Sequence, residues 1–155
     1  IDPTNYLNYG YGLGYLYLEQ KRYSEAEPMF LKALELAPEV ESVYADLGDY
    51  YREVQQYEAA EEMFFKSLAI DSKVESYYGL GLTYEAQGRY EEAAQMYLSY
   101  FENVREKGEV YDALARVYKY MGKIEESRKA IARAIELNPD NQSFHDAARW
   151  IESNN

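Results

Sequence analysis

The sequence is poor in imidazole and thiol groups, the side chains that most often serve as catalytic bases, nucleophiles and zinc ligands. His145 is the only histidine, and the chain contains no cysteine. A metal site needs several converging ligands, and covalent catalysis needs a nucleophile beside a base. The sequence therefore predicts no catalytic residue and no metal site. We interpret His145 as a surface or capping residue.

Adjacent glutamates could suggest a pair of catalytic carboxylates. Such pairs occur at Glu61–Glu62, Glu91–Glu92 and Glu125–Glu126. All three fall at the same phase of the repeat described below, early in a predicted helix. Acidic side chains at that position interact favourably with the helix dipole. We therefore interpret these pairs as structural.

Three closely spaced glycines, Gly10, Gly12 and Gly14, invite comparison with a phosphate-binding loop. No strand is predicted before them. Their spacing differs from the dinucleotide fingerprint, and no Lys-Ser or Lys-Thr follows. The sequence therefore predicts no bound cofactor.

The strongest signal is an internal repeat of about 34 residues. Each unit begins with the frame aromatic-x-x-Leu-Gly-x-x-Tyr, in which one unit has Ala for Gly and the first has Gly for the aromatic residue. The frames are Gly10, Leu13, Gly14, Tyr17; Tyr44, Leu47, Gly48, Tyr51; Tyr77, Leu80, Gly81, Tyr84; and Tyr111, Leu114, Ala115, Tyr118. Successive final tyrosines are 34, 33 and 34 residues apart. Spacings of three, four and seven place these residues on one side of a helix.

The second half of each unit also repeats. A small residue is followed four positions later by a large apolar one, in the pairs Ala26 and Phe30, Ala60 and Phe64, Ala93 and Tyr97, and Ser127 and Ile131. Pro38 and Pro139 close two of the units. Over residues 7–141 this pattern resembles the tetratricopeptide repeat family. The resemblance implies an all-α fold, a right-handed superhelical solenoid of about four helix–turn–helix units.

We expect a single domain over residues 1–155, with repeats at about 7–40, 41–73, 74–107 and 108–141. A further helix at about 142–153 should cap the stack. The expected repeat helices are 7–20, 23–36, 41–54, 57–70, 74–87, 90–106, 108–121 and 124–137. The helix over 90–106 should run long, with Gly108 as its C-terminal cap. Residues 1–5 look like the tail of a preceding repeat, so we expect a fragment of a longer array.

Gly14, Gly48 and Gly81 lie inside predicted helices, where each costs up to about 1 kcal/mol relative to alanine. Close contact between paired helices would compensate for this cost. We expect the small alanine early in the second helix to be the matching partner.

The charge of the chain limits the classes of partner. The formal net charge is −12, which argues against nucleic acid and against an anionic membrane surface. No stretch is apolar enough for membrane insertion. A protein or peptide partner, possibly basic, fits this charge. The compartment stays open: a cytoplasmic location is favoured, but an N-terminal targeting segment could be missing.

The resemblance implies that the first helices line a concave groove. The side of these helices that packing leaves open is acidic and rich in tyrosine. We predict peptide-binding residues at Asn8, Tyr11, Tyr15, Asp49, Glu53, Glu75, Tyr78, Glu85, Asp112 and Arg116. The leading hypothesis is a non-enzymatic interaction scaffold. The alternatives are a self-assembly module that forms a homo-oligomer, and a regulatory helical domain of a larger protein.

Overall fold

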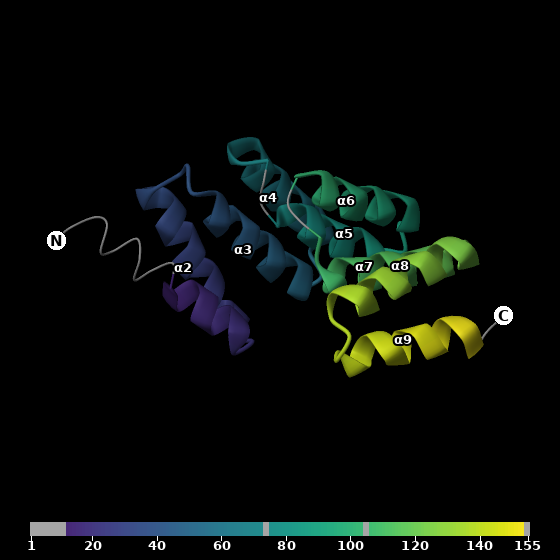
Figure 1. Ribbon diagram of the computed structural model, residues 1–155. Coiled ribbons are helices and arrows are strands. Elements are labelled where there is room, and N and C mark those ends of the chain that lie inside the picture. The colour runs from purple at the N-terminus through teal and green to yellow at the C-terminus, as the bar shows by residue number, and fades with distance from the viewer. Residues whose placement is uncertain (1–11, 73–74, 104–105, 154–155) are drawn as a thin grey trace. The chain divides into compact units, whose positions relative to one another are not determined.

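The computed structural model describes residues 12–72, 75–103 and 106–153 (Figure 1). Within them every regular element is a helix and no strand occurs. Residues 12–19 form the described part of the first helix. The helices that follow are α2 (Tyr23–Leu36), α3 (Glu41–Glu53), α4 (Tyr57–Ile70), α5 (Ser76–Ala86), α6 (Tyr90–Asn103), α7 (Gly108–Tyr120), α8 (Ile124–Leu137) and α9 (Gln142–Ser153). The helices predicted at 23–36, 57–70, 124–137 and 142–153 are confirmed residue for residue.

The chain divides into two compact units, residues 1–79 and 80–155, with the division inside α5. In the first unit Phe30, Val43 and Leu47 are fully buried, and they form the core between α2 and α3. In the second unit Ala113 and Val117 of α7 are fully buried. Each buried set follows the helical spacing seen in the repeat.

The largest error in the predicted boundaries lies at the end of the third repeat. The helix expected over 90–106 is α6, which ends at Asn103. Gly108, expected as its C-terminal cap, is instead the buried first residue of α7. A methyl group on Gly108 would lie 2.7 Å from Cε2 of Phe144. Glycine therefore allows α9 to approach the start of α7 closely.

The turn within each helix pair requires one residue in the left-handed region. Gly88 and Gly122 have φ of 72° and 74° there, and Lys21 and Gln55 have φ of 57° and 61°. These four residues are 34, 33 and 34 positions apart, so the turn repeats with the helices. Glycine adopts this conformation readily, whereas a residue with a Cβ is strained in it.

The glycines of the first helices pack against aromatic rings. A methyl group on Gly14 would lie 2.8 Å from the ring of Phe30, and one on Gly48 would lie 2.7 Å from that of Phe64. In the second unit Gly81 meets the ring of Tyr97 in the same way. The expected partner was the alanine early in the second helix. That expectation is wrong, because the ring, sixteen residues after the glycine in each case, occupies the space.

The fourth repeat carries a different pair at these two positions. Ala115 stands in place of the glycine and Ile131 in place of the ring, and both are buried. Alanine adds a methyl group on one helix, and isoleucine removes volume on the other. The two changes offset each other, as expected for a close-packed interior.

Helix α9 is held onto α7 and α8 by charged side chains. Lys119 Nζ donates hydrogen bonds to the carbonyl oxygens of Trp150 (2.6 Å) and Ile151 (2.8 Å). Arg128 of α8 donates to both carboxylate oxygens of Glu152, each at 2.8 Å. Arg149 takes the place of the contact glycine in α9, and 72% of its side chain is exposed. An exposed arginine leaves no room for the aromatic ring of a further helix at this position. This supports our proposal that α9 caps the stack.

Replacing Gln55 with glycine should stabilise the protein. The left-handed conformation costs a non-glycine residue about 1–2 kcal/mol, while glycine adds roughly 0.4–1 kcal/mol of unfolded-state entropy. We expect a net gain on the order of 0.5 kcal/mol in urea unfolding. The control is Gln56→Gly at the next position, where φ is −90°. This variant should lose stability, and a loss in both variants would contradict the prediction.

Gly48→Ala should destabilise the protein by about 1–3 kcal/mol, because the added methyl collides with the ring of Phe64. Gly12→Ala is the matched control, since nothing lies within 4 Å of that site. Adding Phe64→Ile to Gly48→Ala recreates the pairing of Ala115 with Ile131. The double variant should lose less stability than the two single variants combined. Simple additivity in thermal unfolding would show that the two positions do not compensate each other.

Candidate binding site in the first unit

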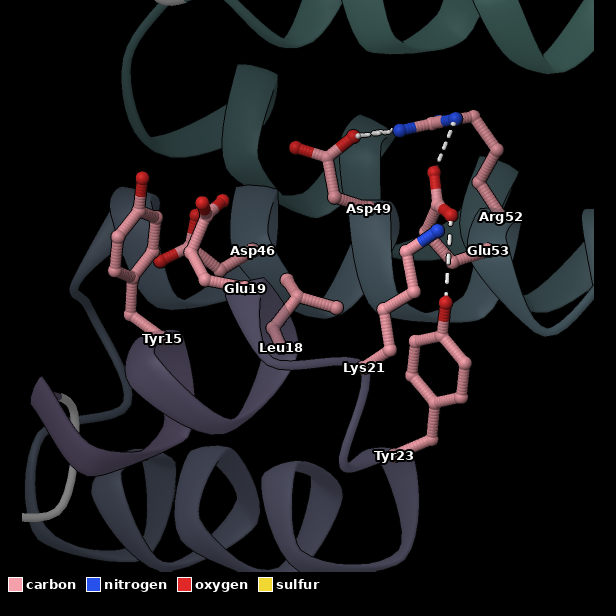
Figure 2. Close-up of a pocket in the computed structure, with 9 residues that line it drawn as sticks. All are labelled: Tyr15, Leu18, Glu19, Lys21, Tyr23, Asp46, Asp49, Arg52 and Glu53. Carbon is pink, nitrogen blue, oxygen red and sulfur yellow. Dashed lines mark hydrogen bonds and ion pairs between the residues drawn. The ribbon is translucent and has the colours of Figure 1, made fainter.

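A cleft of about 480 Å³ opens between the first helix, residues 12–19, and α3 (Figure 2). The first helix, the turn after it, the start of α2 and one side of α3 supply its walls. The lining residues are Tyr15, Leu18, Glu19, Lys21, Tyr23, Asp46, Asp49, Arg52 and Glu53. Four of these carry a carboxylate, two carry a cationic group and two are tyrosines. The cleft is therefore polar, with aromatic and apolar surface in its walls.

One end of the cleft gathers negative charge around a tyrosine. Figure 2 shows Tyr15, Glu19 and Asp46 side by side there. Tyr15 is 49% exposed. The charge of Glu19, partial burial, and the charges of Asp46 and Asp49 together raise the pKa of the Tyr15 hydroxyl. This shift reports a negative potential that would attract a cation.

The other end of the cleft is internally paired. Nη2 of Arg52 lies 3.0 Å from Oδ1 of Asp49, and Nη1 lies 2.9 Å from Oε1 of Glu53. The hydroxyl of Tyr23 donates to Oε2 of Glu53 at 3.5 Å. Burial raises the pKa of Asp49; the Arg52 charge opposes this effect, while Glu53 and Glu75 add to it. The single guanidinium thus holds two carboxylates in place.

Glu27 of α2 fixes the position of α3 relative to α2. The hydroxyls of Tyr50 and Tyr51 donate to its two carboxylate oxygens, at 3.1 Å and 2.8 Å. Tyr50 also makes an edge-to-face contact with Tyr23, with ring centroids 6.2 Å apart. Tyr23 lines the cleft, so these contacts position one of its walls.

Three models of the tetratricopeptide repeat match the chain, over residues 5–73, 45–104 and 108–141. Together they cover most of its length. The chain belongs to the tetratricopeptide repeat family. Members of this family are protein-interaction scaffolds in general and bind protein partners. They are generally not enzymes.

Solved structures share the fold. A structure from a study of Pseudomonas aeruginosa PilF has a TM-score of 0.86 and 24% identity, and the match covers 96% of this chain and 68% of that one. The MamA protein has a TM-score of 0.79 and 18% identity, with 96% and 81% covered. The Cut9–Hcn1 assembly of the APC/C has a TM-score of 0.84 and 16% identity, with 97% and 30% covered. These matches confirm the predicted fold class, an all-helical solenoid of tetratricopeptide repeats. No curated protein matches the chain.

The predicted groove residues fall into separate groups within these repeats. Tyr15, Asp49 and Glu53 line the cleft. Glu75 directly precedes α5 and Tyr78 lies in its first turn, and neither lines the cleft. Asn8 and Tyr11 lie outside the described residues.

The prediction did not include the other six lining residues: Leu18, Glu19, Lys21, Tyr23, Asp46 and Arg52. Helical spacing places Glu19 and Arg52 on the groove-facing side of their helices, although the predicted peptide-binding residues did not include them. Lys21 comes from the turn and is its left-handed residue, which no glycine marks, and Tyr23 is the first residue of α2.

The three predicted residues of the second unit form an ion-pair cluster. Arg116 Nε lies 2.5 Å from Oε1 of Glu85, and its Nη1 lies 3.0 Å from Oδ2 of Asp112. The hydroxyl of Tyr97 donates to Oε2 of Glu85 at 3.0 Å. The cluster joins α5, α6 and α7, and its one guanidinium bonds to both carboxylates. It offers a partner less unbalanced charge than the cleft does.

Other kinds of site find no support in the described part of the chain. It contains no group of three or more His, Cys, Asp and Glu side chains placed to hold a metal ion. Its helices also lack the combination of length and hydrophobicity that a bilayer crossing requires.

The contact between Tyr51 and Glu27 predicts a loss of stability at alkaline pH. Burial and the Glu27 carboxylate raise the pKa of Tyr51 to about 12 in the folded protein, above its ordinary value of 10.0. The stabilisation is therefore complete below pH 10 and is lost as the pH rises towards about 12. Urea unfolding of Tyr51→Phe should show a smaller loss over this range than the wild type, and Glu27→Gln should also reduce it. An unchanged loss in both variants would contradict this assignment.

Proposed function

We propose that this chain is a scaffold that holds an extended, basic segment of a partner protein in the cleft between the first helix and α3. The observation that carries the proposal is the cleft itself, where Tyr15 stands exposed beside the carboxylates of Glu19 and Asp46. An exposed tyrosine offers a rigid aromatic surface, and tyrosine is enriched at the centres of protein interfaces.

The distribution of charge favours the first unit as the docking place. Residues 1–79 contain 15 Asp and Glu against six Lys and Arg, whereas residues 80–155 contain 13 against ten. The acidic excess of the whole chain is therefore concentrated where the cleft lies. A field of one sign steers an oppositely charged partner towards the surface and accelerates its association.

The shape of the cleft favours an extended segment over a small ligand. The walls come from two successive first helices and the turn between the first helix and α2. A cleft with walls from these three segments can bind several consecutive side chains of a peptide. Leu18 gives an apolar wall for the aliphatic part of a lysine or arginine, whose charged end can then reach the acidic end of the cleft.

A fluorescence-anisotropy titration tests the proposal. The probe is a Gly-Ser peptide that carries several lysines and arginines. We expect affinity to fall as salt rises, because exposed charges are screened beyond roughly 8–10 Å near physiological ionic strength. Tyr15→Ala should weaken binding by about tenfold, as loss of a central aromatic contact does. Glu19→Gln should have a smaller effect, since a single exposed ion pair contributes about 0.2–1 kcal/mol.

Glu62→Gln on α4 is the matched control, because it removes the same charge from an exposed site in the same unit. Its affinity should equal that of the wild type. Affinity that responds to neither Tyr15→Ala nor salt would overturn the proposal. If the peptide then fails to bind while the protein grows in size with concentration, the self-assembly hypothesis takes its place.

A further inference from the structure

Arg52 already occupies part of the cleft as a cation. Its Nε and Nη2 lie 3.3 Å and 3.0 Å from the same oxygen of Asp49, and its Nη1 reaches Glu53 on the other side. Figure 2 shows the guanidinium lying between these two carboxylates. Only 23% of the Arg52 side chain is exposed. The cleft is thus shaped around a bound guanidinium.

The ion pairs of Arg52 hold no two helices together. Asp49 and Glu53 are both on α3, three residues before Arg52 and one after it. Arg116 in the second unit is different, because its bond to Glu85 spans 31 residues and joins α7 to α5. Moving Arg116 would break an ion pair between helices, whereas moving Arg52 would break ion pairs only within α3. Arg52 can therefore leave its place without breaking an ion pair between helices.

We propose that Arg52 is an internal occupant of the cleft and that an arginine side chain of the partner takes its place between Asp49 and Glu53. This inference rests on the proposed function and specifies its ligand. The displaced guanidinium of Arg52 turns into solvent, and the incoming guanidinium makes the same kind of hydrogen bonds. The exchange therefore leaves no carboxylate without a cation.

The geometry favours arginine over lysine in the partner. A guanidinium presents several N–H groups in one plane and can bond two carboxylates at once, as Arg52 does. A lysine ammonium is a compact charge and cannot reproduce this arrangement. Tyr15, Glu19 and Asp46 then add attraction at the other end of the cleft, which suits a segment with more than one cationic residue.

Competition with Arg52 lowers the apparent affinity. A binding-competent state that is only partly populated reduces the affinity in proportion to its population. Removing the internal guanidinium should therefore strengthen binding, although Arg52 lies inside the site. An ordinary contact residue would give the opposite result, so the sign of the effect decides the question.

The experiment compares Gly-Ser peptides that carry several arginines, several lysines or several citrullines, the last being the uncharged counterpart of arginine. We expect the arginine peptide to bind the wild type more tightly than the lysine peptide, and the citrulline peptide to bind weakly. Arg52→Gln should bind the arginine peptide tighter by about fivefold or more, the effect of one partly buried ion pair. Arg52→Lys keeps the charge but cannot span both carboxylates, so it should also bind tighter.

Lys32→Gln is the control for net charge. Lys32 pairs with Glu35 on an exposed part of α2 in the same unit, so its loss changes the charge equally. Its affinity should stay within twofold of the wild type, as expected of a single screened surface charge. An equal gain in Lys32→Gln would assign the effect to net charge and would overturn the inference. Circular dichroism of each variant checks that the helices are retained.

A second readout follows Arg52 directly. The Nε–Hε nuclear magnetic resonance signal of Arg52, assigned by its absence from Arg52→Lys, should move to the position of a solvated arginine when the arginine peptide is added. Weaker or unchanged binding by Arg52→Gln, with Tyr15→Ala still impaired, would overturn the inference and leave the proposed function standing. Absence of binding by the wild type and Arg52→Gln alike would overturn both.

Discussion

The close contact between a small residue on each first helix and the large side chain sixteen positions later determines how the rest of each repeat is arranged. In the first three repeats the pair is glycine with Phe30, Phe64 or Tyr97. Because the ring lies against the helix backbone, the two helices approach closely and their rotation is fixed. The residue directly after the small residue then lies on the side of the first helix that faces away from the ring. Tyr15 and Asp49 are two such residues, and both line the cleft.

The same position gives different surfaces in the two units. Arg116 follows Ala115 just as Asp49 follows Gly48. Asp49 faces a cleft and pairs with an arginine of its own helix, whereas Arg116 reaches across to Glu85 on another helix. Equivalent backbone positions thus support an internal cross-link in one unit and an acidic cleft in the other. The identity of a few side chains, rather than the fold, decides which surface each unit presents at this position.

The sequence predicted the helices well because their boundaries depend on local features. The repeated tyrosines and glycines show which side of each helix is apolar. Four helices begin and end at the predicted residues. The failures have a common cause. Gly108 was assigned to the end of a helix, but it is a glycine because Phe144 packs against it from 36 residues away. The partner of Gly48 was likewise misassigned, since spacing along one helix does not show which side chain of the next helix fills the gap.

The cleft could be predicted only in part. Helical offsets reached Tyr15, Asp49 and Glu53, which share one face of the first helices. They could not show that Arg52 would bond to Glu53 as well as to Asp49, because residues next to each other in sequence do not normally face one another on a helix. They also missed the contribution of the turn. Lys21 adopts the left-handed conformation because the packing of the paired helices requires it, and no glycine in the sequence marks that position.

The ring of Phe64 has a consequence for how the first unit opens. It lies against Gly48 of α3 and also against Gly79 of α5. One side chain is therefore shared by the first helices of two successive repeats. If α4 detaches, both helices lose the same contact, so their backbone amides should become exposed to hydrogen exchange together. Neighbouring repeats joined in this way behave as one cooperative unit and not as a chain of independent ones.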